Sequence, residues 1–164
     1  MTAQEWIFVV FGVIGSGAAL AVVTARNVVR AALYLVVTLA SVAAVYLLLG
    51  AEFVAWVQVL IYVGAIVVLL LFGLMLTRAP IGQETLDNQQ RGMAAVVGLG
   101  ILGGLVFLVQ DAFKGLRIDP SPSRTAAIGE QIFRSFVLPF EVVSFLLLAA
   151  LIGAIVLARK EEAP

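Results

Sequence analysis

Apolar residues form five long runs along the chain, and polar residues gather between them. A helix needs about 20 mainly apolar residues to cross a hydrocarbon core of about 30 Å, and each run is near that length. A membrane β-barrel would instead show short segments that alternate in hydrophobicity. The pattern predicts an all-α, polytopic integral membrane protein, a single membrane domain over residues 1–164 with five transmembrane helices at about 7–24, 28–49, 53–77, 92–113 and 138–158.

The segments between these runs differ in length. The links at 25–27 and 50–52 are short, so we expect the first three helices to be antiparallel neighbours, with Asn27 capping the second helix. The links at 78–91 and 114–137 are long and contain turn-forming residues. We expect a short interfacial helix within the second of them, at about residues 128–136, and no soluble domain anywhere.

Composition supports a membrane location and excludes several kinds of chemistry. The chain is 63% hydrophobic and 12% charged with a mean hydropathy of +1.14, whereas soluble domains are about half apolar and about a quarter charged. Ten basic residues balance ten acidic ones, so no nucleic-acid partner is expected. Without histidine or cysteine the chain cannot ligate iron-sulfur clusters, hold haem by imidazole or build the usual zinc sites. We therefore expect no catalytic residue, no metal and no cofactor bound by this chain.

Basic residues near the helix ends predict the orientation in a bilayer. One side receives six of them and the other side four: Arg26, Arg30, Arg78, Arg91, Arg159 and Lys160 against Lys114, Arg117, Arg124 and Arg134. This bias predicts an outside N-terminus and a cytoplasmic C-terminus in a bacterial cytoplasmic (inner) membrane. Because no basic residue precedes the first apolar run, we expect a retained helix rather than a cleaved signal peptide.

Two glutamates are placed at the predicted helix starts. Glu52 begins the third helix and Glu141 falls in the first turn of the fifth, where the positive end of the helix dipole favours an anion. Each could be a capping or interfacial charge. Each could also be a way station for protons or a contact with a charge on a partner subunit.

The third helix carries the only polar face predicted near the membrane midplane. Gln58 and Tyr62 are four residues apart and so would share a face of an α-helix. Gly64 and Ala65 follow, which permit close approach of another helix and weaken this turn. Tyr62 could simply bond to a neighbouring helix, or this segment could be a functional site. No buried lysine, aspartate or acid pair is present, so a self-contained pump is not expected.

Small residues at four-residue spacing predict packing surfaces for other transmembrane helices. They occur in the first, fourth and fifth helices, as Gly12 with Ser16, Gly100 with Gly104, and Ala149 with Gly153.

Three segments resemble one known family. Residues 58–72, with the Tyr-x-Gly-Ala segment at 62–65, are similar to the signature helix of subunit J of proton-pumping NADH:quinone oxidoreductase, respiratory complex I, whose mitochondrial counterpart is chain 6. Residues 26–33 and the Pro-Phe-Glu segment at 139–141 agree with the same family. The resemblance covers the whole chain, with five helices in the expected places.

The resemblance implies a place and a role. Such subunits lie in the membrane arm beside subunits A, H and K, in a complex that also contains the antiporter-like subunit N. The partner subunits hold NADH, FMN, the iron-sulfur clusters and quinone. In this family the third helix can carry a π-bulge at the positions of Tyr62 and Gly64, thought to gate a water path that couples quinone chemistry to proton pumping. Some relatives carry an acid where this chain has Gln58, which as a neutral amide could only orient water.

Two other readings remain open. The chain could be a purely structural subunit that helps to assemble the same arm. It could also belong to a related multi-subunit cation/proton antiporter or a membrane hydrogenase. A small independent channel is the weakest candidate, because few polar side chains could line a pore.

Overall fold

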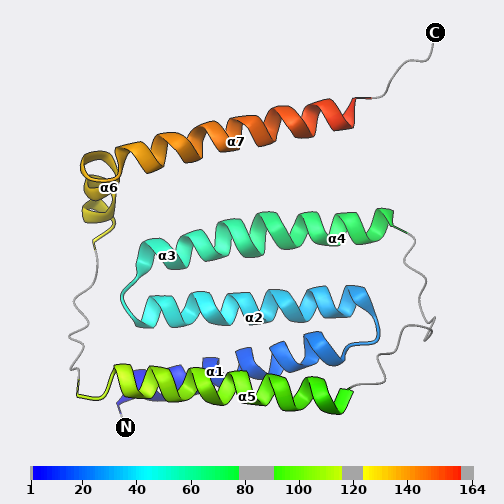
Figure 1. The fold of residues 1–164 in the computed structure, drawn as a ribbon, viewed down its shortest axis with the longest axis vertical. Coiled ribbons are helices and arrows are strands. Elements are labelled where there is room, and N and C mark those ends of the chain that lie inside the picture. The colour runs from blue at the N-terminus through cyan, green and yellow to red at the C-terminus, as the bar shows by residue number, and fades with distance from the viewer. Residues whose placement is uncertain (1, 78–90, 116–123, 160–164) are drawn as a thin grey trace. The chain divides into compact units, whose positions relative to one another are not determined.

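Helices are the sole regular elements of the computed structural model, which describes residues 2–77, 91–115 and 124–159 (Figure 1). In chain order they are α1 (Ala3–Thr24), α2 (Val28–Leu48), α3 (Glu52–Val57), the π-helix η1 (Gln58–Ile66), α4 (Val67–Leu76), α5 (Arg91–Ala112), α6 (Thr125–Arg134) and α7 (Val137–Ala158). Because α3, η1 and α4 are continuous, five helices are long and apolar enough to span a membrane. The predicted all-α class and the five predicted spans are confirmed; the link at 78–90 lies outside the described residues.

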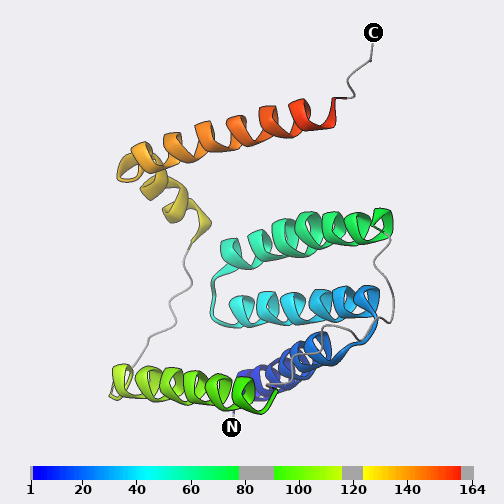
Figure 2. The ribbon, with the colours of Figure 1, turned by 45° about the vertical axis from the view of Figure 1, so that its right-hand side comes forward.

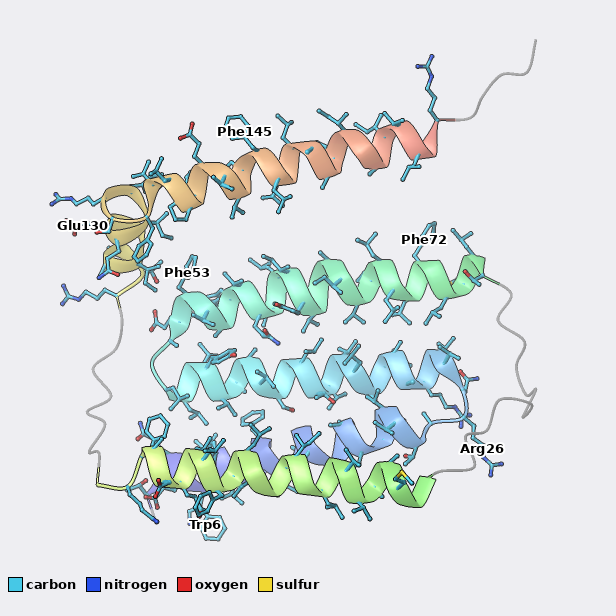
Figure 3. All side chains as sticks on the ribbon, viewed as in Figure 1. Trp6, Arg26, Phe53, Phe72, Glu130 and Phe145 are labelled. Atoms are coloured by element: carbon cyan, nitrogen blue, oxygen red, sulfur yellow. The ribbon has the colours of Figure 1, made fainter. Side chains whose placement is uncertain are left out.

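Apolar side chains project from these helices on all sides (Figure 3). α7 has no buried residue, and no residue of the most hydropathic stretch of α5 or α7 is buried in this chain. A helix that is hydrophobic all round is suited to lipid or to the interior of a larger assembly. The outer surfaces of these helices are therefore suited to contact with lipid or with other apolar helices.

The chain divides into two compact units, Met1–Ser121 and Pro122–Pro164, and the first contains a layer of three antiparallel helices. In that layer α2 contacts α1 on one side and the α3–η1–α4 helix on the other (Figures 1 and 2). The buried residues are small: Ala18, Ala32, Ser41, Ala43 and Ala55, together with Gln58 and Val67. Small side chains let transmembrane backbones approach closely, so the layer is held by close backbone packing.

The two turns of this layer are defined by local hydrogen bonds. The Asn27 side chain accepts from the backbone N–H groups of Val29 and Arg30 at 2.9 and 3.2 Å, which confirms the predicted cap. After α2, the Gly50 and Ala51 N–H groups donate to the carbonyls of Leu47 and Tyr46. This pattern closes a helix when the first donor residue is left-handed, and Gly50 has a φ of 72°. The chain thus reverses within three residues, which makes α2 and α3 neighbours.

Gly15 is the α1 glycine that packs closely against α2. A Cβ added there would lie 3.0 Å from the Cβ of Ser41, whose hydroxyl donates to the Val37 carbonyl at 2.8 Å. By contrast, a Cβ added at Gly12 would have no neighbour within 4 Å, and the same holds for Gly100, Gly104 and Gly153. The glycines among the predicted small-residue positions therefore make no close contact in the chain itself, and the glycine that does was not predicted.

The second unit contains α6 and α7, which meet at Ser135 and Phe136. The rings of Phe133 and Phe140 pack edge to face there, with their centroids 5.2 Å apart. The short helix predicted near residues 128–136 exists but runs from Thr125 to Arg134. The prediction that Glu141 lies in the first turn of the last helix is wrong, because α7 already begins at Val137 and Glu141 falls in its second turn.

Gly15→Val should destabilise the α1–α2 pair, because the new side chain would overlap Ser41. Overpacking of this kind costs about 1–3 kcal/mol, whereas Gly12→Val, which changes helix propensity equally but meets open space, should be nearly neutral. Thermal denaturation of the purified full chain in detergent measures both variants. Ser41→Gly should recover part of the loss in Gly15→Val, and equal stability of the two valine variants would contradict the contact.

Candidate functional site in the third transmembrane helix

The middle of the third transmembrane helix is a π-helix. It covers nine residues, Gln58–Ile66, and the N–H of Val67 continues it by donating to the carbonyl of Tyr62, five residues back. The π-bulge implied by the family resemblance is therefore present in this structure. At 3.6 residues per turn, nine residues would make about two and a half turns of α-helix, so the segment is longer than the single-turn bulges that are usual.

The local sequence explains why this segment departs from α-helical geometry. Four β-branched residues, Val59, Ile61, Val63 and Ile66, fall within these nine positions, together with Gly64. β-Branched side chains and glycine both have low α-helix propensity. In the π form the segment keeps backbone hydrogen bonding, so it departs from the α-helix without leaving its backbone groups unpaired.

The π-helix shifts which residues face α2. Ala55 is buried before it and Gln58 is buried at its start. Directly after it Val67 is 0% exposed, whereas the adjacent Ile66 is 47% exposed. In an uninterrupted α-helix, residue 66 would fall three turns after Ala55 and share its face. The buried position is instead one residue later, so the π-helix accommodates one surplus residue. It thereby sets the register of all of α4 against α2.

The two polar residues that the sequence places on one face differ in burial. Gln58 is 8% exposed, whereas Tyr62 is 46% exposed and Val63 is the half-buried residue of this turn. Gln58 is therefore packed against the rest of the chain, whereas Tyr62 is largely exposed on the surface of this helix.

Gln58 is a buried amide without a partner among the described residues. Its side chain forms no hydrogen bond. Among the described residues, every side-chain nitrogen or oxygen that is fully enclosed does have a hydrogen-bond partner, so the Gln58 amide atoms are not fully enclosed. Its amide atoms therefore keep some access to the surroundings. An amide offers two N–H donors and a carbonyl acceptor, so Gln58 can orient water but cannot serve as an acid or base.

Gly64 and Ala65 lie in the last turn of the π-helix and are exposed. A Cβ added at Gly64 would lie 3.4 Å from the carbonyl oxygen of Val59, the residue five positions back. A methyl group would just fit at that distance. A branched side chain would crowd the backbone carbonyls of the π-helix.

The two glutamates lie apart from this segment in the chain. Glu52 is the first residue of α3, but the N-cap is Ala51 and no side chain caps the helix. Its carboxylate is favourably placed for the helix dipole without capping it. Glu141 belongs to the other unit, in α7. Within the described residues no three acidic side chains form a group that could hold a metal ion.

Val63 and Val67 were missed by reasoning from the sequence, although they fix the register. Hydrophobic periodicity cannot reveal them, because the helix is apolar on every side and shifting it by one residue leaves the pattern unchanged. The only sequence signal is the run of β-branched residues that ends at Gly64 and Ala65.

Comparison with known proteins gives a family match over most of the chain. The family described as NADH-ubiquinone/plastoquinone oxidoreductase chain 6 matches residues 18–157. This range includes all of α2, α3, η1 and α4, and all but the last residue of α7.

Individual relatives agree with that match. The chain is 42% identical to "NAD(P)H-quinone oxidoreductase chain 6" of Leptolyngbya boryana, over 96% of this chain and 80% of the relative. It is 43% identical to "F(420)H(2) dehydrogenase subunit J" of Methanosarcina mazei, over 87% and 84%. It is 38% identical to "NADH-quinone oxidoreductase subunit J" of Rhodobacter capsulatus, over 99% and 85%.

The π register can be tested by thiol labelling, since the chain has no cysteine of its own. In the purified full chain in detergent, Ile66→Cys should react with a maleimide several times faster than Val67→Cys, because residue 66 is exposed and residue 67 is buried. Val54→Cys, at an exposed position before the π-helix, serves as the reactive control. A regular α-helix would reverse the order of residues 66 and 67.

Proposed function

Because the chain belongs to the family of NADH-ubiquinone/plastoquinone oxidoreductase chain 6 and is thus a multi-pass membrane subunit of such a complex, we propose that it couples quinone reduction to proton translocation by gating hydration at its third transmembrane helix. The observation that carries the proposal is the hydrogen bond from Val67 to Tyr62 across five residues. A π-helix that can become an α-helix is a two-state element, which is what a gate requires.

The proposed gate exchanges one set of backbone acceptors for another. In the α form the Val67 N–H would move from the Tyr62 carbonyl to the Val63 carbonyl, and the surplus residue would be taken up elsewhere in the helix. Tyr62 would then turn about the helix axis relative to Gln58. Their amide and hydroxyl groups together would hold water near the midplane, which neither does alone in the π form. Tyr62 is ten residues after Glu52, about 15 Å along the axis and thus near mid-membrane.

The subunit's surfaces support a place among other membrane subunits. Gly12 and Ser16 line an open groove of about 310 Å³ between α1 and α2. Gly100, Gly104 and Gly153 have open space around them on α5 and α7. In this proposal these faces receive helices of subunits A, H, K and N.

The catalytic chemistry belongs to those partners. NADH, FMN, iron-sulfur clusters and quinone are bound by other subunits, and this chain is non-catalytic. The names of relatives include NAD(P)H, F(420)H(2) and NADH as donors, which fits a subunit remote from the donor site. The proposed location is a bacterial cytoplasmic membrane, with the N-terminus outside and the C-terminus in the cytoplasm.

Gly64→Val should uncouple the assembled complex. The branched side chain would meet the Val59 carbonyl oxygen, already 3.4 Å from an added Cβ, and so hinder the change between π and α forms. Proton uptake by membrane vesicles, followed by quenching of a pH-sensitive dye, should fall several-fold while electron transfer to ferricyanide stays normal. Gly73→Val, a matched change in α4 where an added Cβ meets nothing within 4 Å, should leave both unchanged.

Two results would overturn the gating role. Normal pumping per electron by an assembled Gly64→Val complex is the first. The second is a parallel loss of activity and of intact complex on native gels, which is the result that a purely structural subunit predicts. The neighbouring genes distinguish the remaining alternative, a related antiporter. Genes for a peripheral flavin and iron-sulfur module would flank a subunit of the oxidoreductase, and an antiporter cluster would lack them.

A further inference from the structure

The corner between α6 and α7 carries an open surface cavity of about 390 Å³ that the proposed gate does not use. Its lining is mainly aromatic and aliphatic, with two polar side chains: Phe133, Phe140, Phe145, Leu148, Glu141 and Ser144. On α7, Glu141, Ser144, Phe145 and Leu148 follow one another at spacings of three or four residues, so they form one stripe along the helix. Figure 3 shows Phe145 projecting from α7 and Glu130 on α6.

The polar groups of this cavity can only accept hydrogen bonds. The Glu141 carboxylate has no partner among the described residues. The Ser144 hydroxyl already donates to the Phe140 carbonyl at 2.9 Å, which leaves its oxygen as an acceptor. The nearby base is engaged, because Arg134 pairs with Glu130 at 3.2 Å. A ligand that donates hydrogen bonds and carries positive charge would complement this set.

The depth of Glu141 indicates where such a ligand comes from. Glu141 is four residues after the start of α7, about 6 Å along the axis. With α7 as a membrane span that begins at Val137, this position lies close to the headgroup region, where amphipathic helices bind. From there the apolar stripe continues toward the bilayer core through Phe145 and Leu148.

We propose that the α6–α7 corner binds the ammonium headgroup of a phosphatidylethanolamine molecule, with its acyl chain along Phe145 and Leu148. The primary ammonium supplies three N–H donors to Glu141 and Ser144, and the aromatic rings stabilise a cation beside them. Phosphatidylcholine has a cationic headgroup without N–H donors and so binds less tightly. Anionic phosphatidylglycerol is repelled by Glu141. This site is independent of the proposed gate.

Native mass spectrometry of the full chain, released from micelles doped with one lipid at a time, tests the site. The native chain should retain phosphatidylethanolamine over phosphatidylcholine and phosphatidylglycerol. Glu141→Gln should lower that retention about tenfold, the effect of losing one hydrogen bond to a charged group. Glu130→Gln, which changes a carboxylate of α6 outside the cavity lining, is the matched control and should retain the lipid normally.

Charge reversal provides a gain of binding that loss of folding cannot mimic. Glu141→Lys should prefer phosphatidylglycerol over phosphatidylethanolamine. Unchanged phosphatidylethanolamine retention by Glu141→Gln would overturn the site. A second result would also overturn the site: the Glu141→Gln complex keeps its lipid but loses a neighbouring subunit on native gels. The Glu141 carboxylate would then bind a basic side chain of that partner.

Discussion

Hydrocarbon offers no hydrogen-bond partner, so every backbone N–H and carbonyl in the membrane must be satisfied within the protein. This constraint accounts for the helical spans and also for the form of the irregularity at residues 58–66. A broken helix or an open loop would expose backbone groups to lipid. A π-helix keeps each donor bonded while adding a residue, so the chain can change register at mid-membrane without losing its backbone hydrogen bonds. In the described conformation the Val67 N–H accordingly uses an acceptor five residues back in place of one four residues back.

Hydropathy predicts the gross fold well because lipid imposes it so strongly. The five spans, the antiparallel order of the first three helices and the Asn27 cap follow from apolar run lengths, link lengths and side-chain chemistry. Register does not follow from the same information. A helix that is apolar all round has no sequence pattern to show which residues face its neighbour, so Val67 could not be distinguished from Ile66. The exposure of Tyr62 beside a buried Gln58 depends on that register and was hidden for the same reason.

The sequence also could not predict which particular small residues contact another helix. Gly12 and Ser16 have the expected four-residue spacing, yet Gly15 makes the close approach to α2. Which glycine touches a partner depends on how far each helix is rotated about its axis, and several rotations are compatible with the same composition. Glu141 shows a similar limit, because α7 begins one residue earlier than predicted and that moved the carboxylate out of the first turn.

The three-residue reversal at Gly50 has a consequence for biogenesis. Among the described residues, the main contacts of α1, α2 and the third span are with their neighbours in sequence. Contacts between sequence neighbours have low contact order and form quickly. The layer can thus assemble in the order in which its helices are synthesised, before α5 to α7 exist. A nascent chain would then present a finished three-helix platform to incoming subunits while its own C-terminal part is still being made.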